Sequence, residues 1–172
     1  MRLALTLCTI RPWTPADAES LQRHANNRMV SIQLRDRFPY PYTSDHAQTF
    51  LSWVTTQASP TVWAIEVDGQ ACGGIGIELH TDVERVSAEI GYWLGQQVWG
   101  RGIATEALVA ATKDVFTRFD LTRLYAVPFA DHVASVRVLE KAGYVREGHM
   151  RQSAIKGGTI RDQLLFAAYR NL

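Results

Sequence analysis

A glycine-rich turn just before a predicted helix is the segment best suited to chemistry. Its sequence is Trp99-Gly100-Arg101-Gly102-Ile103-Ala104-Thr105. Small residues let the backbone approach a ligand closely, and the free N–H groups and dipole of a helix N-terminus attract phosphate. The turn therefore predicts an anion site, with an ordinary strand-to-helix turn as the structural alternative.

Two better-known phosphate-binding loops do not match this turn. A P-loop requires Gly-Lys followed by Ser or Thr, and the chain contains no such sequence. A dinucleotide fingerprint requires a third Gly or Ala where the chain has Thr105, and it expects repeated βαβ units. Residues 73–76 are also rich in glycine, but they lie within a predicted hairpin strand and are interpreted as structural.

Hydrophobic periodicity and turn residues divide the chain into alternating elements. Capping residues at Thr14 and Thr43 start two helices, and Asp68-Gly69 indicates a hairpin turn. The predicted strands cover 3–11, 62–67, 71–79, 86–94, 124–127 and two segments around 156–159. The predicted helices cover about 15–26, 44–58, 103–116 and 133–142, and residues 34–42 form a loop.

This order of elements, β-α-α-β-β-β-α-β-α-β-β, indicates an α/β fold. Early hairpins, one strand–helix–strand crossover and a terminal hairpin predict a mixed, mostly antiparallel sheet with helices on both faces.

Composition limits the class of protein. The chain has 172 residues, of which 47% are hydrophobic, enough for a single domain over residues 1–172. Its formal net charge of +1 disfavours nucleic acid as a direct partner. Cys8 and Cys72 lack metal-ligand spacing and are interpreted as core residues in a reducing compartment. No signal peptide or membrane-spanning run is found, so we expect a cytoplasmic protein, a monomer or homodimer.

The order of elements and the glycine-rich turn resemble the GNAT superfamily of N-acetyltransferases, and its RimJ/RimL-like branch in particular. The family's pyrophosphate-binding pattern falls on residues 99–104, where Trp99 replaces its Gln or Arg. Residues 89–94 resemble the family's fourth strand, which splays from the fifth to admit the pantetheine arm of acetyl-CoA. Residues 135–144 and 146–148 resemble the following helix, turn and strand.

The resemblance implies acetyl-CoA as cosubstrate and no metal. It implies that backbone N–H groups of a bulged strand end, at Trp93 and Leu94, hold the oxyanion. The residues expected to bind the cosubstrate are Trp93, Leu94, Trp99, Gly100, Arg101, Gly102, Ile103, Ala104, Thr105, His132 and Ser135.

Two side chains are candidates for proton transfer. Glu89, on the strand that borders the thioester, is the candidate base, with a salt-bridged strand residue as the alternative. Many superfamily members protonate the CoA thiolate with a tyrosine, but that position is Leu139 here. The RimJ/RimL-like branch uses a serine, which Ser135 matches, with helix capping as the alternative. That branch's glutamate base corresponds to Ala154, and its asparagine to His132.

The acceptor is expected to be a primary amine on a small molecule or a protein N-terminus. Arg35, Phe38 and Tyr40 lie in the predicted loop 34–42 and are the expected wall of the amine pocket. Two other functions remain open. The chain is alternatively a catalytically weak acyl-CoA sensor, because Leu139 and Ala154 stand where catalytic side chains are expected, or a protein associated with RNA.

Overall fold

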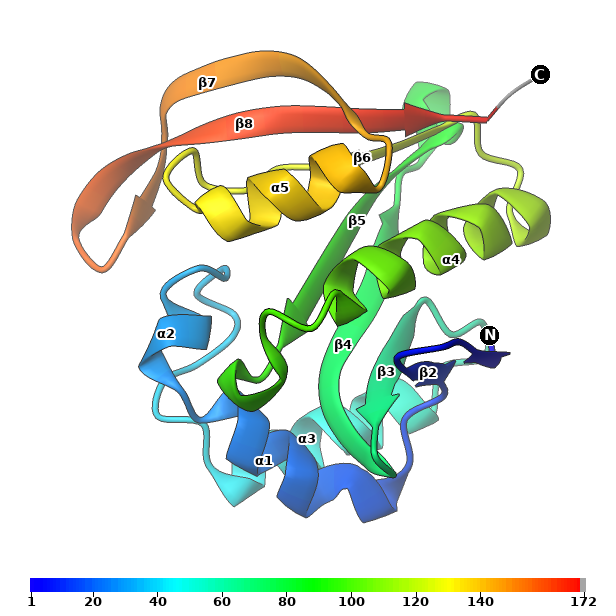
Figure 1. The fold of residues 1–172 in the computed structure, drawn as a ribbon, viewed down its shortest axis with the longest axis vertical. Helices are drawn as coiled ribbons and strands as arrows, with labels where there is room; N and C mark the ends of the chain where they lie inside the picture. The colour runs from blue at the N-terminus through cyan, green and yellow to red at the C-terminus, as the bar shows by residue number, and fades with distance from the viewer. Residues whose placement is uncertain (171–172) are drawn as a thin grey trace.

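The computed structural model describes residues 1–170 and contains one eight-stranded sheet (Figure 1). The strand order is β1-β2-β3-β4-β5-β6-β8-β7, and among these pairs only β5 and β6 run parallel. The strands are β1 Leu3–Ala4, β2 Thr9–Arg11, β3 Val62–Val67, β4 Gln70–Leu79, β5 Ser87–Leu94, β6 Arg123–Ala126, β7 Val145–Lys156 and β8 Thr159–Tyr169. The α-helices are α1 Ala18–Ala25, α2 Arg28–Ser31, α3 Ser44–Thr55, α4 Ile103–Arg118 and α5 Val133–Lys141. The predicted α/β class and mixed sheet are confirmed.

Helices cover both faces of the sheet, each over its own hydrophobic cluster. On one face, α4 and α5 pack against the sheet through residues such as Ile103, Leu108 and Leu139. On the other face, α1 and α3 contribute Leu21 and Leu51 to a second cluster. The apolar face predicted for α4 is the buried one. The sheet therefore separates two layers, one on each face.

The predicted strand 3–11 is wrong as a single element. β1 and β2 are separate, and the Leu5 N–H donates to the Cys8 carbonyl across the turn between them (2.9 Å). The Glu106 carboxylate, in the first turn of α4, accepts hydrogen bonds from the Thr6 and Leu7 amides (3.0 and 2.8 Å). Because a distant helix satisfies these amides, the segment turns rather than staying extended.

Two further details differ from the predictions. The first helix begins with a 3-10 turn at Pro15–Asp17 and becomes α-helical only at Ala18. The short helix α2 was not predicted; the Asn27 side chain caps it by accepting a hydrogen bond from the Met29 N–H (2.8 Å).

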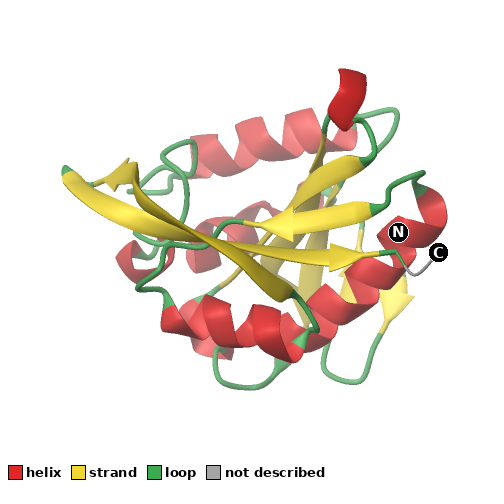
Figure 2. Ribbon diagram, turned by 90° about the horizontal axis from the view of Figure 1, so that it is seen from above, coloured by secondary structure: helices red, strands yellow, loops and turns green. Residues whose placement is uncertain are grey.

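The sheet opens in its middle. Parallel pairing of β5 with β6 covers only residues 87–89 of β5 and stops at the pair Glu89 and Tyr125, whereas β4 pairs with β5 as far as Leu94. The backbone of residues 90–94 on the β6 side is called the open edge of β5 below. The long β7–β8 hairpin crosses above α5 and continues the sheet beyond β6 (Figures 1 and 2).

Candidate active site

The glycine-rich turn leads into an uncapped helix N-terminus. Gly102 is the N-cap residue of α4 and has a left-handed backbone (φ +81°), so it supplies no side chain to cap the helix. Gly100 is also left-handed (φ +74°), and a Cβ there would meet nothing within 4 Å. No side chain therefore caps the first N–H groups of α4, which leaves them available to a phosphate group. The predicted anion site is sterically and electrostatically reasonable.

Trp99, which departs from the family pattern, has a structural contact instead. Its indole N–H donates to the Leu94 carbonyl (2.8 Å), and this bond closes the segment between β5 and α4. Arg101 is half-exposed, with its guanidinium 3.8 Å from the Asp68 carboxylate. Arg101 therefore lies at the surface beside the turn, where its charge adds to the attraction of an anion.

The open edge of β5 carries free backbone groups. The Gly95 N–H donates to the Cys72 carbonyl of β4 (2.7 Å). Because hydrogen-bonded pairs recur at every second residue of an antiparallel ladder, the Trp93 amide also faces β4. The amides of Tyr92 and Leu94 face the opposite side, which β6 leaves open. A ligand arm that starts at α4 and follows this edge passes Leu94 first and Tyr92 next.

This arrangement corrects the expected bulge at Trp93 and Leu94. The register between β4 and β5 runs without a shift from Ala88 to Leu94. An irregularity occurs instead between β3 and β4, where the register shifts at Ile65 and Glu66. Trp93 therefore turns its amide to β4 and its side chain to the face of α1 and α3, where it packs against Phe38.

Ser135, in the first turn of α5, is linked to β5 across the opening. Its hydroxyl lies 2.9 Å from the Tyr92 hydroxyl. Burial raises the pKa of Tyr92 to about 12, so this phenol is protonated at neutral pH. His132, the N-cap residue of α5, has its pKa lowered by burial and by Arg161. Leu139 is fully buried in the core, so it offers no group for chemistry.

Tyr92 is the residue that sequence reasoning missed. Its type carried no distinguishing signal, because an aromatic residue in a strand is usual in any core. The sequence offers one indication: Tyr92 alternates with Ala88 and Ile90, which places all three on the same face of β5.

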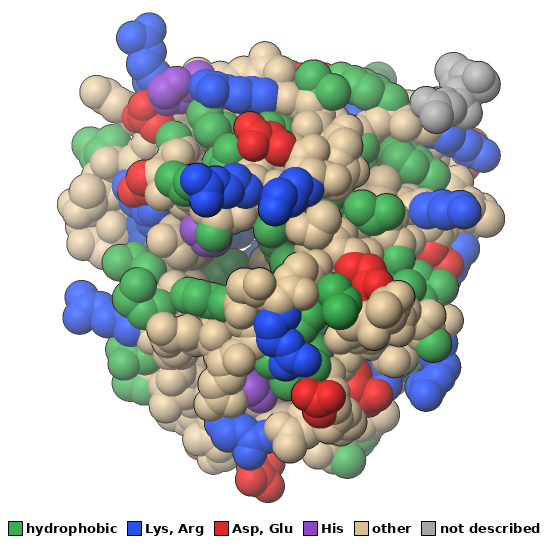
Figure 3. Space-filling model, in the orientation of Figure 1, with side chains coloured by type: hydrophobic (Ala, Val, Ile, Leu, Met, Phe, Trp, Pro, Cys, Tyr) green, Lys and Arg blue, Asp and Glu red, His purple; other side chains and the backbone are tan. Residues whose placement is uncertain are grey.

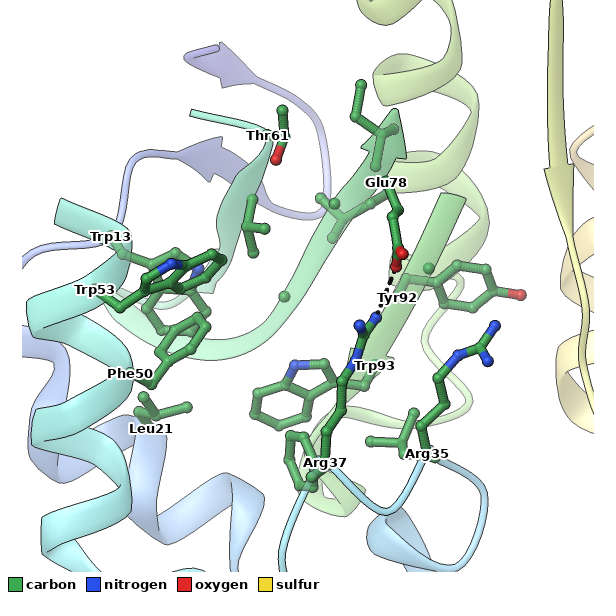
Figure 4. Close-up of a pocket in the computed structure, with 18 of the residues that line it drawn as sticks. Trp13, Leu21, Arg35, Arg37, Phe50, Trp53, Thr61, Glu78, Tyr92 and Trp93 are labelled. Atoms are coloured by element: carbon green, nitrogen blue, oxygen red, sulfur yellow. Dashed lines mark hydrogen bonds and ion pairs between the residues drawn. The ribbon is translucent and has the colours of Figure 1, made fainter. Parts of the chain in front are cut away.

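A cavity of about 890 Å³ lies on the face of α1 and α3, and we call it the aromatic cavity. Aromatic residues from four segments line much of its wall, and Figure 4 shows Trp13, Phe50 and Trp53 grouped together. The aromatic lining residues are Trp13, Phe38, Tyr42, Phe50, Trp53, Tyr92 and Trp93. The space-filling view, which looks at the side of α4 and α5, shows a hollow near the centre of that opposite side (Figure 3).

Two carboxylates stand side by side in this cavity, on the floor formed by the sheet. Glu78 of β4 and Glu89 of β5 are direct cross-strand partners. Arg35 contacts Glu89 (2.5 Å), and Arg37 contacts Glu78 (3.2 Å; Figure 4). The Glu89 hydrogen bond raises the pKa of Arg35. Since like charges directly opposite destabilise a sheet, the two arginines offset a repulsion that the fold creates.

The 34–42 loop is tied to the terminal hairpin. The Lys156 ammonium contacts the Asp36 carboxylate (2.8 Å), and Arg161 donates to the Ile32 carbonyl (2.9 Å). Of the three residues predicted to wall an amine pocket, Arg35 and Phe38 line the aromatic cavity, whereas Tyr40 is not among the residues that line it. Ala154 pairs with Arg161 in the same hairpin and supplies no carboxylate.

Residues 1–170 contain neither a metal-binding cluster nor a membrane-spanning helix. No group of three or more His, Cys, Asp or Glu side chains is placed to hold a metal ion there. No helix in that range is long and apolar enough to span a bilayer.

A model of the acetyltransferase (GNAT) domain matches residues 8–145. The chain belongs to the GNAT acetyltransferase family. This match confirms the predicted resemblance and an acetyltransferase enzyme. The open edge of β5 thus corresponds to the splay expected for the family.

Relatives of this GNAT chain are found in sequence and in structure. It is 34% identical over 107 residues to the uncharacterized N-acetyltransferase YoaA of Bacillus subtilis, covering 61% of this chain and 60% of YoaA. RimL, a ribosomal L7/L12 alpha-N-protein acetyltransferase in complex with coenzyme A, shares the fold with a TM-score of 0.85 and 20% identity over 98% of both chains. RimJ of Mycobacterium smegmatis, in complex with CoA-disulfide, has a TM-score of 0.83 and 26% identity, covering 94% of this chain and 81% of RimJ. The sequence matches span about half to three-fifths of the curated relatives' lengths.

Proposed function

We propose that this chain transfers the acetyl group of acetyl-CoA to a primary amine, on a small molecule or at a protein N-terminus. One observation carries the proposal: the open edge of β5 connects the uncapped N-terminus of α4 with the carboxylate of Glu89. A phosphate site, a slot for an extended arm and a base therefore lie along one strand. Acetyl-CoA, when bound, supplies the activated acyl group as a thioester.

The residues present fit this cosubstrate. Gly100 and Gly102 leave the α4 N-terminus free for the pyrophosphate, and Arg101 contributes positive charge beside it. The Leu94 amide is free to hydrogen-bond an amide of the pantetheine arm in the manner of an added strand. His132 and Ser135, at the start of α5, border the other side of the opening.

Glu89 is proposed to receive the proton of the attacking amine. A primary amine with a pKa of about 10.4 is mostly protonated at neutral pH, so attack on the thioester requires a base or a relaying water. Glu89 belongs to the last β5–β6 pair, where the opening begins. Its side chain is 22% exposed, compared with 63% for Glu78, so it is the more enclosed carboxylate of the pair.

Groups at the open edge and on the other face of β5 carry out the remaining steps, which are stabilisation of the oxyanion and protonation of the thiolate. The Tyr92 amide is the free N–H of the open edge closest to Glu89. We assign it the role of stabilising, by a hydrogen bond, the negative charge that develops on the acetyl carbonyl oxygen. Ser135 then protonates the departing thiolate and regains a proton from solvent, while its hydrogen bond with the Tyr92 phenol, 2.9 Å away, holds the hydroxyl in place. Base and acid thus act from opposite faces of one strand.

A binding experiment tests the cosubstrate. Acetyl-CoA should raise the melting temperature, because it binds the native state, whereas NAD and ATP at equal concentration should not. Release of free CoA with a panel of amines and N-terminal peptides tests the transfer itself. If acetyl-CoA leaves the melting temperature unchanged, the proposal fails.

The acyl-CoA sensor remains the competing proposal, because Leu139 is buried in the core and Ala154 lacks a carboxylate. A sensor would show the thermal shift without CoA release. An amine-dependent release of CoA would eliminate it.

A further inference from the structure

The centre of the floor of the aromatic cavity is formed by glycines, which carry no side chain. Gly76 of β4 and Gly91 of β5 are direct cross-strand partners on the cavity face. A Cβ added to Gly91 would meet nothing within 4 Å, so open space lies directly above it. A Cβ added to Gly76 would instead lie 2.9 Å from the Thr61 carbonyl oxygen and 3.1 Å from the Val62 side chain, so Gly76 is covered. The carboxylate pair Glu78 and Glu89 stands on one side of the glycine pair, and Trp93 stands on the other. The floor is therefore open at Gly91, between an acidic end and an aromatic end.

The aromatic end is a packed set of rings. Trp93 lies edge-on to Phe38, with ring centroids 5.2 Å apart, and Phe50 lies edge-on to Trp13 at 5.4 Å. Trp53, beside Phe50, keeps 50% of its surface exposed. Rings held in this way stack or pack edge-on with a ligand ring. The wall thus favours a flat, apolar ligand body.

The balance of charged side chains in the cavity favours a ligand with a single ammonium group. Its Arg and Glu side chains are Arg35, Arg37, Glu78 and Glu89, and their formal charges cancel. A polyamine carrying several ammonium groups would find no excess of carboxylates to balance it. A ligand with one ammonium can share Glu89 with Arg35 and leave the rest of the cavity to apolar contact.

Building on the proposed function, we infer that the acceptor is a primary amine attached to an aromatic group. The ammonium meets Glu89 beside the open edge, and the ring lies over Gly91 against the aromatic wall. Two residues of strand span about 7 Å, so the nitrogen and the ring are separated by a short linker, as in an arylethylamine. The same chemistry occurs in a free aromatic amine and in a peptide that begins with an aromatic residue.

A panel of amines tests this inference through CoA release. Tryptamine and phenethylamine should show a kcat/KM at least tenfold higher than hexylamine, which has the same charge and no ring, and than spermidine. A C-terminally amidated peptide beginning with Trp distinguishes the two sources: a higher kcat/KM for the peptide assigns an N-terminus as acceptor, and a lower one assigns the free amine.

Two variants locate the ring. Trp53→Ala should lower kcat/KM for tryptamine at least tenfold, whereas the matched control Tyr40→Ala, which removes a ring that is 51% exposed outside the cavity, should not. Gly91→Val, acceptable in a strand, fills the floor. It should lower kcat/KM for tryptamine by a larger factor than for ethylamine. All three variants should keep the thermal shift with acetyl-CoA.

The outcomes separate this inference from the proposed function. Turnover of hexylamine or spermidine at rates equal to tryptamine overturns the aromatic acceptor and leaves the acetyltransferase reaction intact. If no amine is acetylated but acetyl-CoA still raises the melting temperature, calorimetry with tryptamine in the presence of CoA decides: absence of binding overturns the inference. A missing shift with acetyl-CoA overturns the proposed function instead.

Discussion

Glu89 and Ser135 lie on opposite sides of β5, so their loss should affect different steps. Glu89→Gln keeps the shape of the side chain but removes the base. We expect kcat to fall roughly 10²-fold or more, the usual scale for general-base loss, with acetyl-CoA affinity unchanged. Activity should partly return at high pH, where more amine is neutral. Rate profiles against pH for wild type and variant provide the measurement.

Glu78→Gln is the matched comparison, because Glu78 is the cross-strand partner and also contacts an arginine. It should raise KM for the amine while preserving the shape of the pH profile. A wild-type profile in Glu89→Gln would mean that water or another group takes the proton.

Ser135→Ala should be the milder change. A thiol, with a pKa of about 8.5, is far more acidic than an amine, so reprotonating the CoA thiolate is the less demanding step. We expect a smaller loss of kcat than in Glu89→Gln, without recovery at high pH. Steady-state kinetics from pH 6.5 to 9.5 check this, and a loss equal to that of Glu89→Gln would contradict the separate roles.

At the scale of elements, the turn into α4 depends on a backbone that side chains rarely adopt. Gly102→Val places a β-branched residue at φ +81°, with its Cβ 3.4 Å from Leu7, beside the proposed pyrophosphate site. CoA affinity should fall at least tenfold while helix content is retained. Gly158→Val is the control: its φ of +79° brings similar strain to the β7–β8 turn, outside the proposed pyrophosphate site. Calorimetric titration with CoA should separate the two.

A buried histidine, His24, packs against the turn that follows β5. The His24 ring packs so closely that a Cβ on Gly95 would lie 2.3 Å from its Nδ1, and both ring nitrogens are buried without a partner among residues 1–170. Burial lowers the pKa of His24 below its usual 6.5, with a smaller contribution from Arg23. The neutral ring is therefore the form that the fold prefers.

Because the folded state prefers neutral His24, the free energy of unfolding should fall as pH falls. Because the unfolded chain binds the proton more tightly, stability from His24 is complete above pH 6.5 and is lost as pH falls below that value. The urea midpoint of the wild type should drop between pH 7.5 and 5.0 by more than that of His24→Leu, and the comparison cancels other groups, such as His132. Equal drops would mean that His24 is protonated in the folded state.

At the scale of the whole molecule, acetyl-CoA should join the two parts of the sheet. Strands β5 and β6 share only three residue pairs, at 87–89 and 123–125. A ligand lying along the open edge would slow hydrogen exchange at the Tyr92 and Leu94 amides and at the starts of α4 and α5. Pantetheine alone should protect β5 but not α4. Unchanged exchange at β5 with acetyl-CoA would place the arm elsewhere.

Local signals predicted much of this fold. The hairpin strand 62–67 matches β3, because Asp68 and Gly69 both take the positive φ that a tight turn requires. The apolar face of α4 follows directly from its 3.6-residue period. The glycine turn stood out by its own composition, whereas the roles of Glu89 and Ser135 were predicted from the resemblance to the family.

Contacts between distant segments were not predictable from one sequence. The pairing of Tyr92 with Ser135 and the opposition of Gly76 and Gly91 depend on strand register and on how far β6 runs beside β5. The glycines of residues 73–76, interpreted as structural, include Gly76 of the cavity floor. Neither period nor composition encodes such cross-strand partners, because a register is set by the whole sheet.

The contact between Arg161 and the Ile32 carbonyl joins residues 129 positions apart, and it orders the assembly of the protein in time. During synthesis, the 34–42 loop leaves the ribosome long before the β7–β8 hairpin exists to hold it. Domains generally fold as units during synthesis. The wall proposed to face the amine therefore reaches its final position only when almost the entire chain has been made. We expect a nascent chain of this protein to acquire its proposed acceptor site late in synthesis.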